Sequence, residues 1–348
     1  MRLVLSASCA VLALAACSPK AQAPAAPSAA AAAQPVRLAG HTDMPGYAGD
    51  FDHFAVDEKD GRLFLAGEDG GSLKVFDLKT GALVQSLPGF DAPHSLIYLP
   101  DTGELVVVAN TKSRVLDART LAVKRPLALA DGADSLAYDA ARKRAYVVTG
   151  GKDVKMTTSA LVEIDPYTGK TYGQTAFDGD HTEALAVEGQ GSRIFINQTD
   201  KNLLDVVDKT THAIKAKWPI KEAEQNAPLA YDEMTHRLFV VTRKPGKLIV
   251  VNADTGATVQ AFDAPMRVDQ VLWDPGSRRI FVCGGDGHLL VVEQDDADHY
   301  RALPLVATPP ASKTGIYVPS LNRLYLAASP GETKSMGQLV WLDVDPRK

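Results

Sequence analysis

The sequence predicts an all-β protein, a seven-bladed β-propeller whose ring is closed by an N-terminal strand that completes the last blade. The first observation is a repeat in which a charged residue precedes a short β-rich run. Successive charged residues lie 42, 40, 49, 44, 42 and 44 residues apart, a period typical of one four-stranded blade per repeat. The seven runs are Arg62-Leu63-Phe64, Glu104-Leu105-Val106, Arg144-Ala145-Tyr146, Arg193-Ile194-Phe195, Arg237-Leu238-Phe239, Arg279-Ile280-Phe281 and Arg323-Leu324-Tyr325.

The fifth repeat shows the strand pattern most clearly. Short apolar or alternating runs at 229–231, 237–242, 248–252 and 257–262 predict inner, second, third and outer strands. The Gly256 turn before the outer strand suits a bulged hairpin, because glycine adopts positive φ without strain. A short polar residue ends the third strand of each repeat, where its side chain can accept hydrogen bonds from the turn. These residues are Asp77, Asp117, Asp165, Asp208, Asn252, Glu293 and Asp343.

The second observation is that the last repeat stops after its third strand, 338–344, and so lacks an outer strand. The segment 35–44 precedes the first repeat and is the only spare piece of chain. Pairing the two segments would close the ring and remove two exposed sheet edges. We therefore expect the propeller to occupy residues 35–348.

The N-terminus has the form of a bacterial secretory signal. Arg2 precedes an apolar run at 3–14 that is too short to span a bilayer, and the run ends in Leu-Ala-Ala-Cys at 14–17. That ending resembles the lipobox, which implies cleavage after residue 16 and lipidation of Cys17; an ordinary signal peptide with a chance cysteine is the alternative. Ser18, rather than Asp, resembles the pattern retained at the outer membrane.

Residues 17–34 are rich in Ala, Pro and Ser without periodicity, so we expect a lipidated tether rather than a packed domain. Acyl chains supply durable anchoring, and the membrane is then contacted through lipid alone. The expected location is the bacterial cell envelope, at the outer membrane and facing the periplasm. The formal net charge of -5 gives no reason to expect a nucleic-acid partner.

Charged residues recur where the inner strands begin. The position ten residues before each repeated charged residue should lie near the mouth of the central channel. The residues at this position are Asp52, His94, Asp134, Glu183, Ala227, Asp269 and Lys313. Two more histidines, His53 and His181, lie beside this set.

The densest cluster contains His181 and Glu183, which are two apart and would point to one face of a strand. With His94 or Asp134 across the mouth they could bind a divalent cation such as Ca, Mg, Mn or Zn. The alternative is a hydrated acidic mouth that holds no ion. Lys313 faces the mouth acids in this arrangement and would satisfy part of their charge.

His53 and His94 both open inner strands, and each could serve as a base or a ligand or simply as a hydrogen-bonded loop histidine. The loops between second and third strands contribute a candidate basic rim that could meet a carboxylate or phosphate. Solvated loop charges are the alternative reading of this rim. Its residues are Lys152, Lys201, Arg243 and Lys244.

Three strands carry a family resemblance: RAYVVTG at 144–150, RLFVVTR at 237–243 and RIFVCGG at 279–285. They resemble the repeats of the YVTN β-propellers, and in particular the bacterial YncE-like group of secreted propellers. The resemblance covers about residues 35–348 and implies the propeller fold, but no defined activity. Propeller lactonases are similar in having acids at a channel mouth, although no lactonase motif matches residue by residue.

These observations lead to a binding module for a small polar ligand, a metal ion or a partner protein, held on the loop face. The alternative is a metal-dependent hydrolase, similar to a lactonase, in which Glu183, Asp134 and His94 hold the ion and His53 or Asp269 is the base. A scaffold that docks an envelope protein is a third class. The sequence lacks His-Glu-x-x-His, Gly-x-Ser-x-Gly, Cys-x-x-Cys-His and zinc-type Cys spacing, so the familiar metalloprotease, serine hydrolase and haem motifs are absent.

Overall fold

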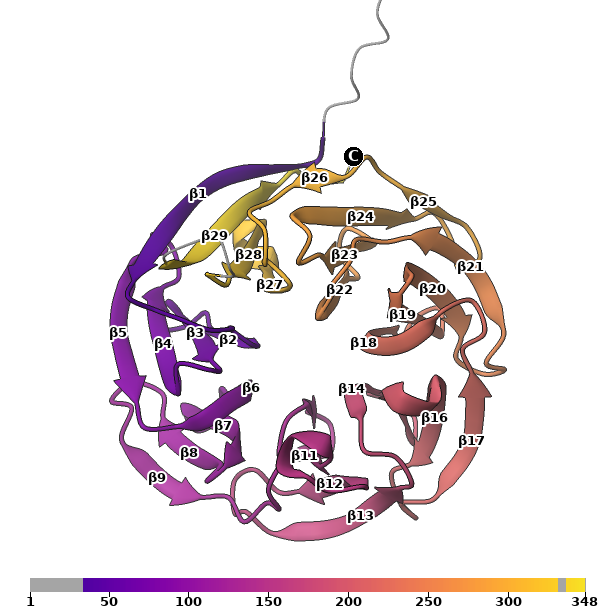
Figure 1. The fold of residues 1–348 in the computed structure, drawn as a ribbon, viewed down its shortest axis with the longest axis horizontal. Coiled ribbons are helices and arrows are strands. Elements are labelled where there is room, and N and C mark those ends of the chain that lie inside the picture. Colours follow the sequence, from indigo (N-terminus) through magenta and orange to yellow (C-terminus); the bar gives the residue numbers. More distant parts are fainter. Residues whose placement is uncertain (1–33, 331–335, 348) are drawn as a thin grey trace, which may run out of the picture. The chain divides into compact units, whose positions relative to one another are not determined.

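The computed structural model describes residues 34–330 and 336–347, which form a ring of seven antiparallel blades around a central axis (Figure 1). This is the predicted fold. The predicted signal peptide at 1–16, the lipidated Cys17 and most of the tether at 17–34 lie outside the described residues. Within the described part of the chain, no helix has the length and apolar character needed to span a membrane.

The blades follow one another in chain order, and each runs from an inner to an outer strand. The first three blades are β2 (Phe54–Asp57), β3 (Arg62–Gly67), β4 (Ser72–Asp77) and β5 (Leu83–Pro88); β6 (Asp91–Leu99), β7 (Glu104–Thr111), β8 (Arg114–Asp117) and β9 (Val123–Pro126); and β10 (Leu136–Asp139), β11 (Arg144–Gly150), β12 (Ser159–Ile164) and β13 (Thr171–Phe177). The next three are β14 (Thr182–Val187), β15 (Arg193–Gln198), β16 (Leu203–Asp208) and β17 (Ile214–Pro219); β18 (Glu224–Asp232), β19 (Arg237–Lys244), β20 (Gly246–Asn252) and β21 (Thr258–Asp263); and β22 (Gln270–Asp274), β23 (Arg279–Cys283) and β24 (His288–Gln294), the last pairing with both β25 (Tyr300–Ala302) and β26 (Val306–Ala307).

The seventh blade contains both ends of the described chain. Its strands are β27 (Thr314–Val318), β28 (Arg323–Ala328), β29 (Met336–Val344) and, in the outer position, β1 (Val36–Pro45). Strand β1 is antiparallel to β29, with Val36 opposite Val344 and Pro45 opposite Met336. The predicted closure by an N-terminal strand is therefore confirmed.

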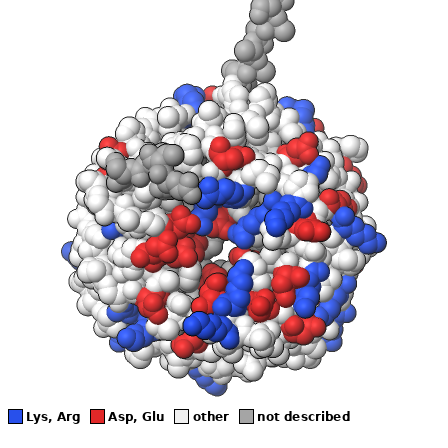
Figure 2. All heavy atoms as spheres, in the orientation of Figure 1, with Lys and Arg blue, Asp and Glu red and all other residues white. Residues whose placement is uncertain are grey.

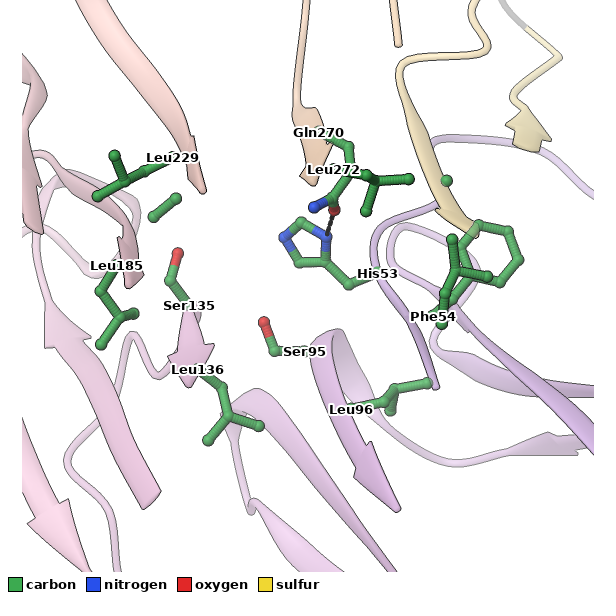
Figure 3. Close-up of a pocket in the computed structure, with 13 residues that line it drawn as sticks. His53, Phe54, Ser95, Leu96, Ser135, Leu136, Leu185, Leu229, Gln270 and Leu272 are labelled. Atoms are coloured by element: carbon green, nitrogen blue, oxygen red, sulfur yellow. Dashed lines mark hydrogen bonds between the residues drawn. The ribbon is translucent and has the colours of Figure 1, made fainter. Parts of the chain in front are cut away.

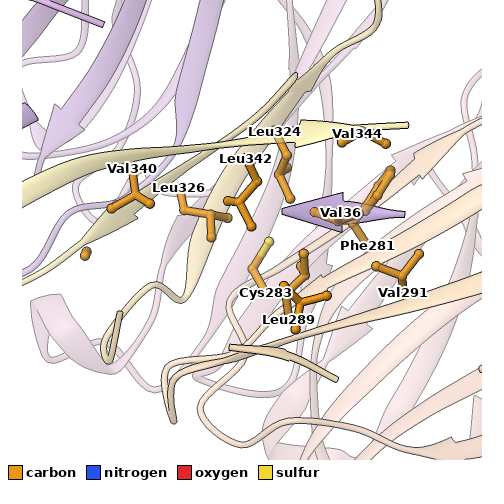
Figure 4. Close-up of a cluster of buried hydrophobic side chains, with 12 residues drawn as sticks. Val36, Phe281, Cys283, Leu289, Val291, Leu324, Leu326, Val340, Leu342 and Val344 are labelled. Carbon is orange, nitrogen blue, oxygen red and sulfur yellow. The ribbon is translucent and has the colours of Figure 1, made fainter. Parts of the chain in front are cut away.

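The hydrophobic core is divided among the gaps between neighbouring blades. Seven buried clusters are found in the described residues, and each joins two adjacent blades. The cluster at the closure brings Val36 and Val344 against Phe281 and the fully buried Cys283 (Figure 4). Cys283 thus packs as a small hydrophobic residue, and burial raises the pKa of its thiol to about 12.

Five of the six repeated arginines, all except Arg144, donate to a backbone carbonyl of the next blade. Arg62 Nη1 donates to the carbonyl of Ala118 at 2.7 Å, and Arg323 Nη1 donates to the carbonyl of Lys79 at 2.9 Å across the closure.

In the first five repeats the residue that ends the third strand orders the following turn, as predicted for this position. Asp77 Oδ1, for example, accepts the backbone N–H of Thr80 at 2.8 Å. In the last two the prediction was wrong: Glu293 accepts from Arg279 and Arg301, and Asp343 pairs with Arg323. Both repeated positions are therefore structural.

Two kinds of loop share the face that carries the mouth: those leading into the inner strands and those joining second to third strands. Short 3-10 helices follow the second strands of the third and fourth blades, and a third follows an inner strand. They are η1 (Lys152–Val154), η2 (Thr199–Lys201) and η3 (Pro319–Leu321). Figure 2 looks onto a face whose centre is hollow and surrounded by acidic and basic side chains.

Candidate functional site

The residues ten positions before the repeated charged residues meet around one cavity of about 170 Å³. We call this cavity the mouth pocket. Its lining consists of the seven residues of that sequence position together with six more from the strands and loops beside them. The lining residues are Asp52, His53, Glu68, His94, Asp134, Ser135, Asp153, Glu183, Ala184, Ala227, Arg243, Asp269 and Lys313.

Backbone hydrogen bonds hold the mouth residues at the starts of the inner strands. The N–H of Asp52 donates to the carbonyl of Ala66, and the N–H of Asp134 donates to that of Val148, both at 3.0 Å. The two carboxylates are thereby fixed by the second strands of their own blades. Their position depends on the sheet rather than on a mobile loop tip.

One side of the pocket pairs its carboxylates with cations, and we call it the paired half: Glu183, Arg243, Asp269 and Lys313. Arg243 bridges the two acids, with Nη1 3.2 Å from Glu183 Oε1 and Nη2 donating to Asp269 Oδ1. Lys313 Nζ lies 3.0 Å from Asp269 Oδ2 and 3.1 Å from Asp50 Oδ2. Both cations are therefore already committed to protein carboxylates.

The pKa shifts in the paired half follow from this pairing. Burial acts to raise the pKa of the Asp269 carboxyl, but the charges of Lys313 and Arg243 outweigh it and set the pKa at about 2. Burial likewise opposes ionisation of Glu183, yet its hydrogen bond from His181 and the charge of Arg243 lower its pKa. Both acids stay ionised across the physiological range.

The opposite side carries more carboxylates than cations, and we call it the acid-rich half: Asp52, Glu68, His94 and Asp134. His94 Nδ1 donates to Asp52 Oδ2 at 2.8 Å and lies 3.9 Å from Asp134 Oδ1. Burial alone would lower the pKa of His94, but the charge of Asp134 and the hydrogen bond and charge of Asp52 raise it to about 10. His94 is therefore an imidazolium at neutral pH, the one cation of this half.

The carboxylates of Asp134 and Glu68 accept no hydrogen bond from any described residue. Burial and, after it, the charge of Asp52 raise the pKa of Glu68 to about 7, against the opposing charges of His94 and Lys313. Burial also raises the pKa of Asp134 to about 6, although His94 pulls it down. These two carboxylates gain little from the protein when they ionise, so a cation supplied from outside would stabilise them.

His53 stands between the two halves at the top of the channel beneath the mouth. Its Nδ1 lies 2.8 Å from Gln270 Oε1, and its Nε2 lies 3.3 Å from Asp52 Oδ1. With an amide oxygen on one side and a carboxylate on the other, the ring can donate from both nitrogens. Burial opposes the resulting charge, but Asp52 and Asp269 outweigh it and raise the pKa of His53.

The remaining predicted residues lie around the pocket. His181 sits behind Glu183, donating from Nε2 to Glu183 Oε1 at 2.6 Å and accepting at Nδ1 from Lys152 Nζ at 2.9 Å. Lys152 and Lys201 are exposed, and Lys201 Nζ is 3.8 Å from Asp200 Oδ2. Lys244 is exposed at the end of β19.

Arg243 differs from the prediction because it lies inside the mouth pocket and not on a basic rim. The attraction of two buried carboxylates explains the difference, since Arg243 is the only guanidinium among the lining residues of this pocket. The predicted loop at 243–247 is also shorter than expected. Strand β19 extends to Lys244, and β20 starts at Gly246.

Three donor atoms could hold a metal ion. Asp52, His94 and Asp134 each offer a ligand atom, and these atoms all lie within 4.8 Å of one another. Carboxylate oxygen and imidazole nitrogen suit several divalent cations, provided that the imidazole loses its Nδ1 proton. The set predicted from sequence contained Glu183 in place of Asp52; Glu183 is instead held by His181 and Arg243 on the other side of the pocket.

Glu68 and Asp153 were missed by the sequence reasoning. Glu68 follows its repeated charged residue by six positions, as Arg243 does in the fifth blade, so the same count would have found both. The sequence reasoning treated this loop position as basic because it looked only at lysines and arginines. Asp153 belongs to η1, in the long loop of the third blade.

Comparison with models of protein families and with curated proteins finds no match. Solved structures do match along most of the chain. One, described as the crystal structure of the mitotic checkpoint complex, aligns with a TM-score of 0.73 and 17% identity over 96% of this chain and 98% of its own. A chain of Kuenenia stuttgartiensis hydrazine synthase aligns with a TM-score of 0.71 and 13% identity over 87% and 98%. At such identities the likeness shows the β-propeller fold alone.

Proposed function

We propose that this chain is a binding module that holds a small, positively charged polar ligand in the mouth pocket. The observation that carries the proposal is the pair of partially buried carboxylates, Asp134 and Glu68, that have no hydrogen-bond donor among the described residues. Partly buried acids are left with fewer water contacts than surface acids, so each gains from a donor that a ligand can bring. A ligand that brings N–H donors and a positive charge would supply what these acids lack.

The proposal includes the location and family resemblance drawn from the sequence. Lipidation at Cys17 would anchor the propeller at the outer membrane, facing the periplasm, and the repeats resemble those of YVTN and YncE-like propellers. A partner protein of the envelope could present the same cationic group on a loop. A mass spectrum of the membrane-extracted protein tests the anchor, because a diacylated or triacylated Cys17 adds a defined mass to the N-terminal peptide.

Thermal unfolding in the presence of small cations tests the proposed function. Ammonium, methylammonium and ethanolamine at millimolar concentration should raise the melting temperature of the protein, whereas sodium acetate should not. The double substitution Asp134→Asn with Glu68→Gln should remove the effect. Asp263→Asn, an exposed acid on outer strand β21, is the matched control and should leave it intact. A melting temperature that none of these cations raises would refute the proposal.

A second function is favoured by the donor group at Asp52, His94 and Asp134. A divalent ion held there could lower the pKa of a bound water or polarise a carbonyl, as a lactonase-like hydrolase requires. Neither predicted base is free to accept a proton: the low pKa of Asp269 makes that carboxylate a weak proton acceptor, and His53 would first have to lose the proton that Asp52 and Asp269 stabilise.

Metal removal separates this alternative from the binding module. A metal-dependent hydrolase should lose melting temperature in EDTA, regain it with one of Ca, Mg, Mn or Zn, and hydrolyse simple lactones only in the metal-loaded form. Asp52→Asn should abolish both effects, with Asp263→Asn again as the control. If neither EDTA nor any of the four ions changes the melting temperature, the hydrolase is excluded and the cation-binding proposal is unaffected.

A further inference from the structure

Two cavities outside the mouth pocket differ in how they follow from the repeat. One, of about 220 Å³, is lined by residues in or directly before all seven inner strands, which surround an open centre (Figure 3). A ring of blades encloses such a space by itself. The other, of about 420 Å³, joins the third and fourth blades, which are neighbours in the ring (Figure 1), and we call it the interblade cavity. Its lining residues are Arg142, Arg144, Glu163, Tyr172, Lys209, Thr210 and His212.

Arg144 is the first of three lining residues that depart from the repeat. The repeated arginines of five other blades donate to a carbonyl of the next blade, but Arg144 does not. Its Nη1 donates to the carbonyl of Lys143 at 3.1 Å within its own turn, and its guanidinium lies 3.8 Å from the ring centre of Tyr172. Its Nη2 donates to no acceptor among the described residues. The link to the next blade is therefore missing where the interblade cavity lies.

Glu163, the second departure, stands two positions before the end of its third strand and opposite Tyr146 of β11. The equivalent position of the other six blades is apolar. Its residues there are Val75, Val115, Val206, Val250, Val291 and Trp341. Glu163 is 7% exposed, with Oε1 3.4 Å from Arg144 Nε and Oε2 2.7 Å from His212 Nε2. A carboxylate has replaced a core side chain and holds one group from each wall of the cavity.

His212, the third departure, lies in the turn after β16 with a φ of 55°, in the left-handed region that favours glycine. The equivalent residue is Leu121 in the second blade and glycine in the first, third and fifth. These glycines are Gly81, Gly169 and Gly256. The imidazole packs against Gly173 of β13, where a Cβ would clash with the ring. The third blade thus leaves room for a histidine that Glu163 then orients.

The charge of the interblade cavity is positive. The guanidinium groups of Arg142 and Arg144 face one carboxylate, that of Glu163, which leaves one positive charge, or two when His212 is protonated. Lys209 adds nothing to this count, because its Nζ pairs with Asp139 Oδ2 at 2.6 Å. An anion is therefore the ligand that the cavity favours.

We propose that the interblade cavity binds the phosphate group of a small phosphorylated molecule. Arg142 and Arg144 from the third blade and the Thr210 hydroxyl from the fourth would donate to its oxygens. A tetrahedral phosphate accepts from both walls at once, whereas a carboxylate accepts mainly in one plane. A phosphate monoester carries about −1.5 to −2 charges at pH 7, which matches the cavity.

The size and place of the interblade cavity fit this ligand. A volume of about 420 Å³ is in the range of small-molecule pockets, so it leaves room for the organic part of the ester. Strand β11 begins and strand β16 ends on the face remote from the mouth pocket. The site is therefore separate from the mouth pocket, and it does not depend on the proposed function.

Calorimetric titration with inorganic phosphate and with glycerol 2-phosphate, at constant ionic strength and about pH 7.5, tests the inference. Both should bind with one site per chain, the ester more tightly, and sodium acetate should not bind. Arg144→Gln should weaken both affinities about ten- to a hundredfold. Arg142→Gln and Thr210→Ala, at exposed positions, should each weaken them about three- to tenfold and serve if Arg144→Gln does not fold.

The matched control is Arg62→Gln, the equivalent change in the first blade. It removes a hydrogen bond to the Ala118 carbonyl, so it should lower the melting temperature while leaving both phosphate affinities within about twofold. Equal weakening by Arg62→Gln and Arg144→Gln would show that binding follows the integrity of the ring, and the inference would fail.

Three further outcomes would overturn the inference. Acetate that binds as tightly as phosphate would show a general anion surface rather than a phosphate site. Failure of both phosphate and the ester to bind would leave the three departures from the repeat as structural features alone. Loss of phosphate binding in the Asp134→Asn, Glu68→Gln double variant would place the phosphate in the mouth pocket, because that variant leaves the interblade cavity unchanged.

Discussion

The two halves of the mouth pocket use the same residue types and reach opposite electrostatic states. In the paired half Glu183 pairs with Arg243 and His181, Asp269 pairs with Arg243 and Lys313, and the pKa values of both acids lie below the ordinary range. Asp134 and Glu68 in the acid-rich half are also partly buried, but neither is paired with a lysine or arginine, and their pKa values lie above the ordinary range although His94, His53 and Lys313 oppose the rise. Partial burial is common to all four acids, so direct pairing with a cation decides the direction.

The difference between the two halves distinguishes charges that stabilise the fold from charges that are available to a ligand. A half whose charges are mutually satisfied can be explained by the stability of the fold alone. A half whose charges lack protein partners must be satisfied by water or by a bound ligand. The charge in a cleft is therefore most informative when it is compared between equivalent positions of a repeat.

The largest effect should come from removing the arginine of the paired half. Arg243→Met would leave Glu183 and Asp269 buried with fewer partners, and we expect a loss of about 2–4 kcal/mol in the free energy of unfolding. Urea denaturation measures it. The control is Lys247→Met, which breaks an exposed pair with Asp263 and should cost less than about 1 kcal/mol. Equal losses in the two variants would mean that the two halves do not differ in how their charges are satisfied.

Neutralising one acid in each half should change stability in opposite directions. Glu183→Gln weakens the bonds to Arg243 and His181, so a loss of about 1–3 kcal/mol is expected at pH 8. Asp134→Asn removes a carboxylate that ionises unfavourably, and a gain of about 0.5–1 kcal/mol is expected after allowing for solvent screening at its exposed oxygen. Losses of similar size in both variants would remove the distinction between the halves.

The smallest effect is the pH dependence of the acid-rich half. The Glu68 pKa is about 7 when folded and 4.5 in the reference state, so between these values the folded form binds more protons and stability falls as pH rises. His94 titrates at higher pH. Its contribution to the free energy of unfolding is complete below its reference pKa of 6.5 and is lost as pH rises through about 10.

Unfolding free energies measured from pH 4.5 to pH 7.5 should therefore decline more steeply in the natural protein than in Glu68→Gln. The expected difference is about 1–2 kcal/mol across this interval. Glu68→Gln leaves every other titrating group in place. Subtracting its unfolding free energies from those of the natural protein therefore isolates the contribution of the Glu68 carboxyl. Parallel curves would show that Glu68 is well solvated and that its half has no excess of buried charge.

The fold was predictable because its signals repeat. Seven charged residues at a period in the low forties set the number of blades, and the missing last strand required 35–44 to close the ring, where β1 lies. The role of the charged residues was not predictable from one repeat. The link from Arg62 to the Ala118 carbonyl depends on the neighbouring blade, which local sequence does not reveal.

The position of the mouth residues was predictable for the same reason, but their partners were not. Counting ten residues back from each repeat finds Asp52 and Asp269 equally well and cannot show that only Asp269 meets Arg243 and Lys313. Those contacts join residues of neighbouring blades, for example Arg243 and Glu183, which are 60 positions apart. The reach of each side chain to the next blade decides them, and no sequence period encodes it.

The pairing of β1 with β29 also determines where the polypeptide joins the ring. Strands β28 and β29 are second and third strands, joined on the face that carries Glu68 and Arg243, so Met336 begins on that face and Val344 ends on the other. Val36 is opposite Val344, and the chain therefore enters from the face remote from the mouth. The start of β1 and the end of β29 therefore both lie on the face remote from the mouth pocket, so the strand pairing that closes the ring begins away from the opening.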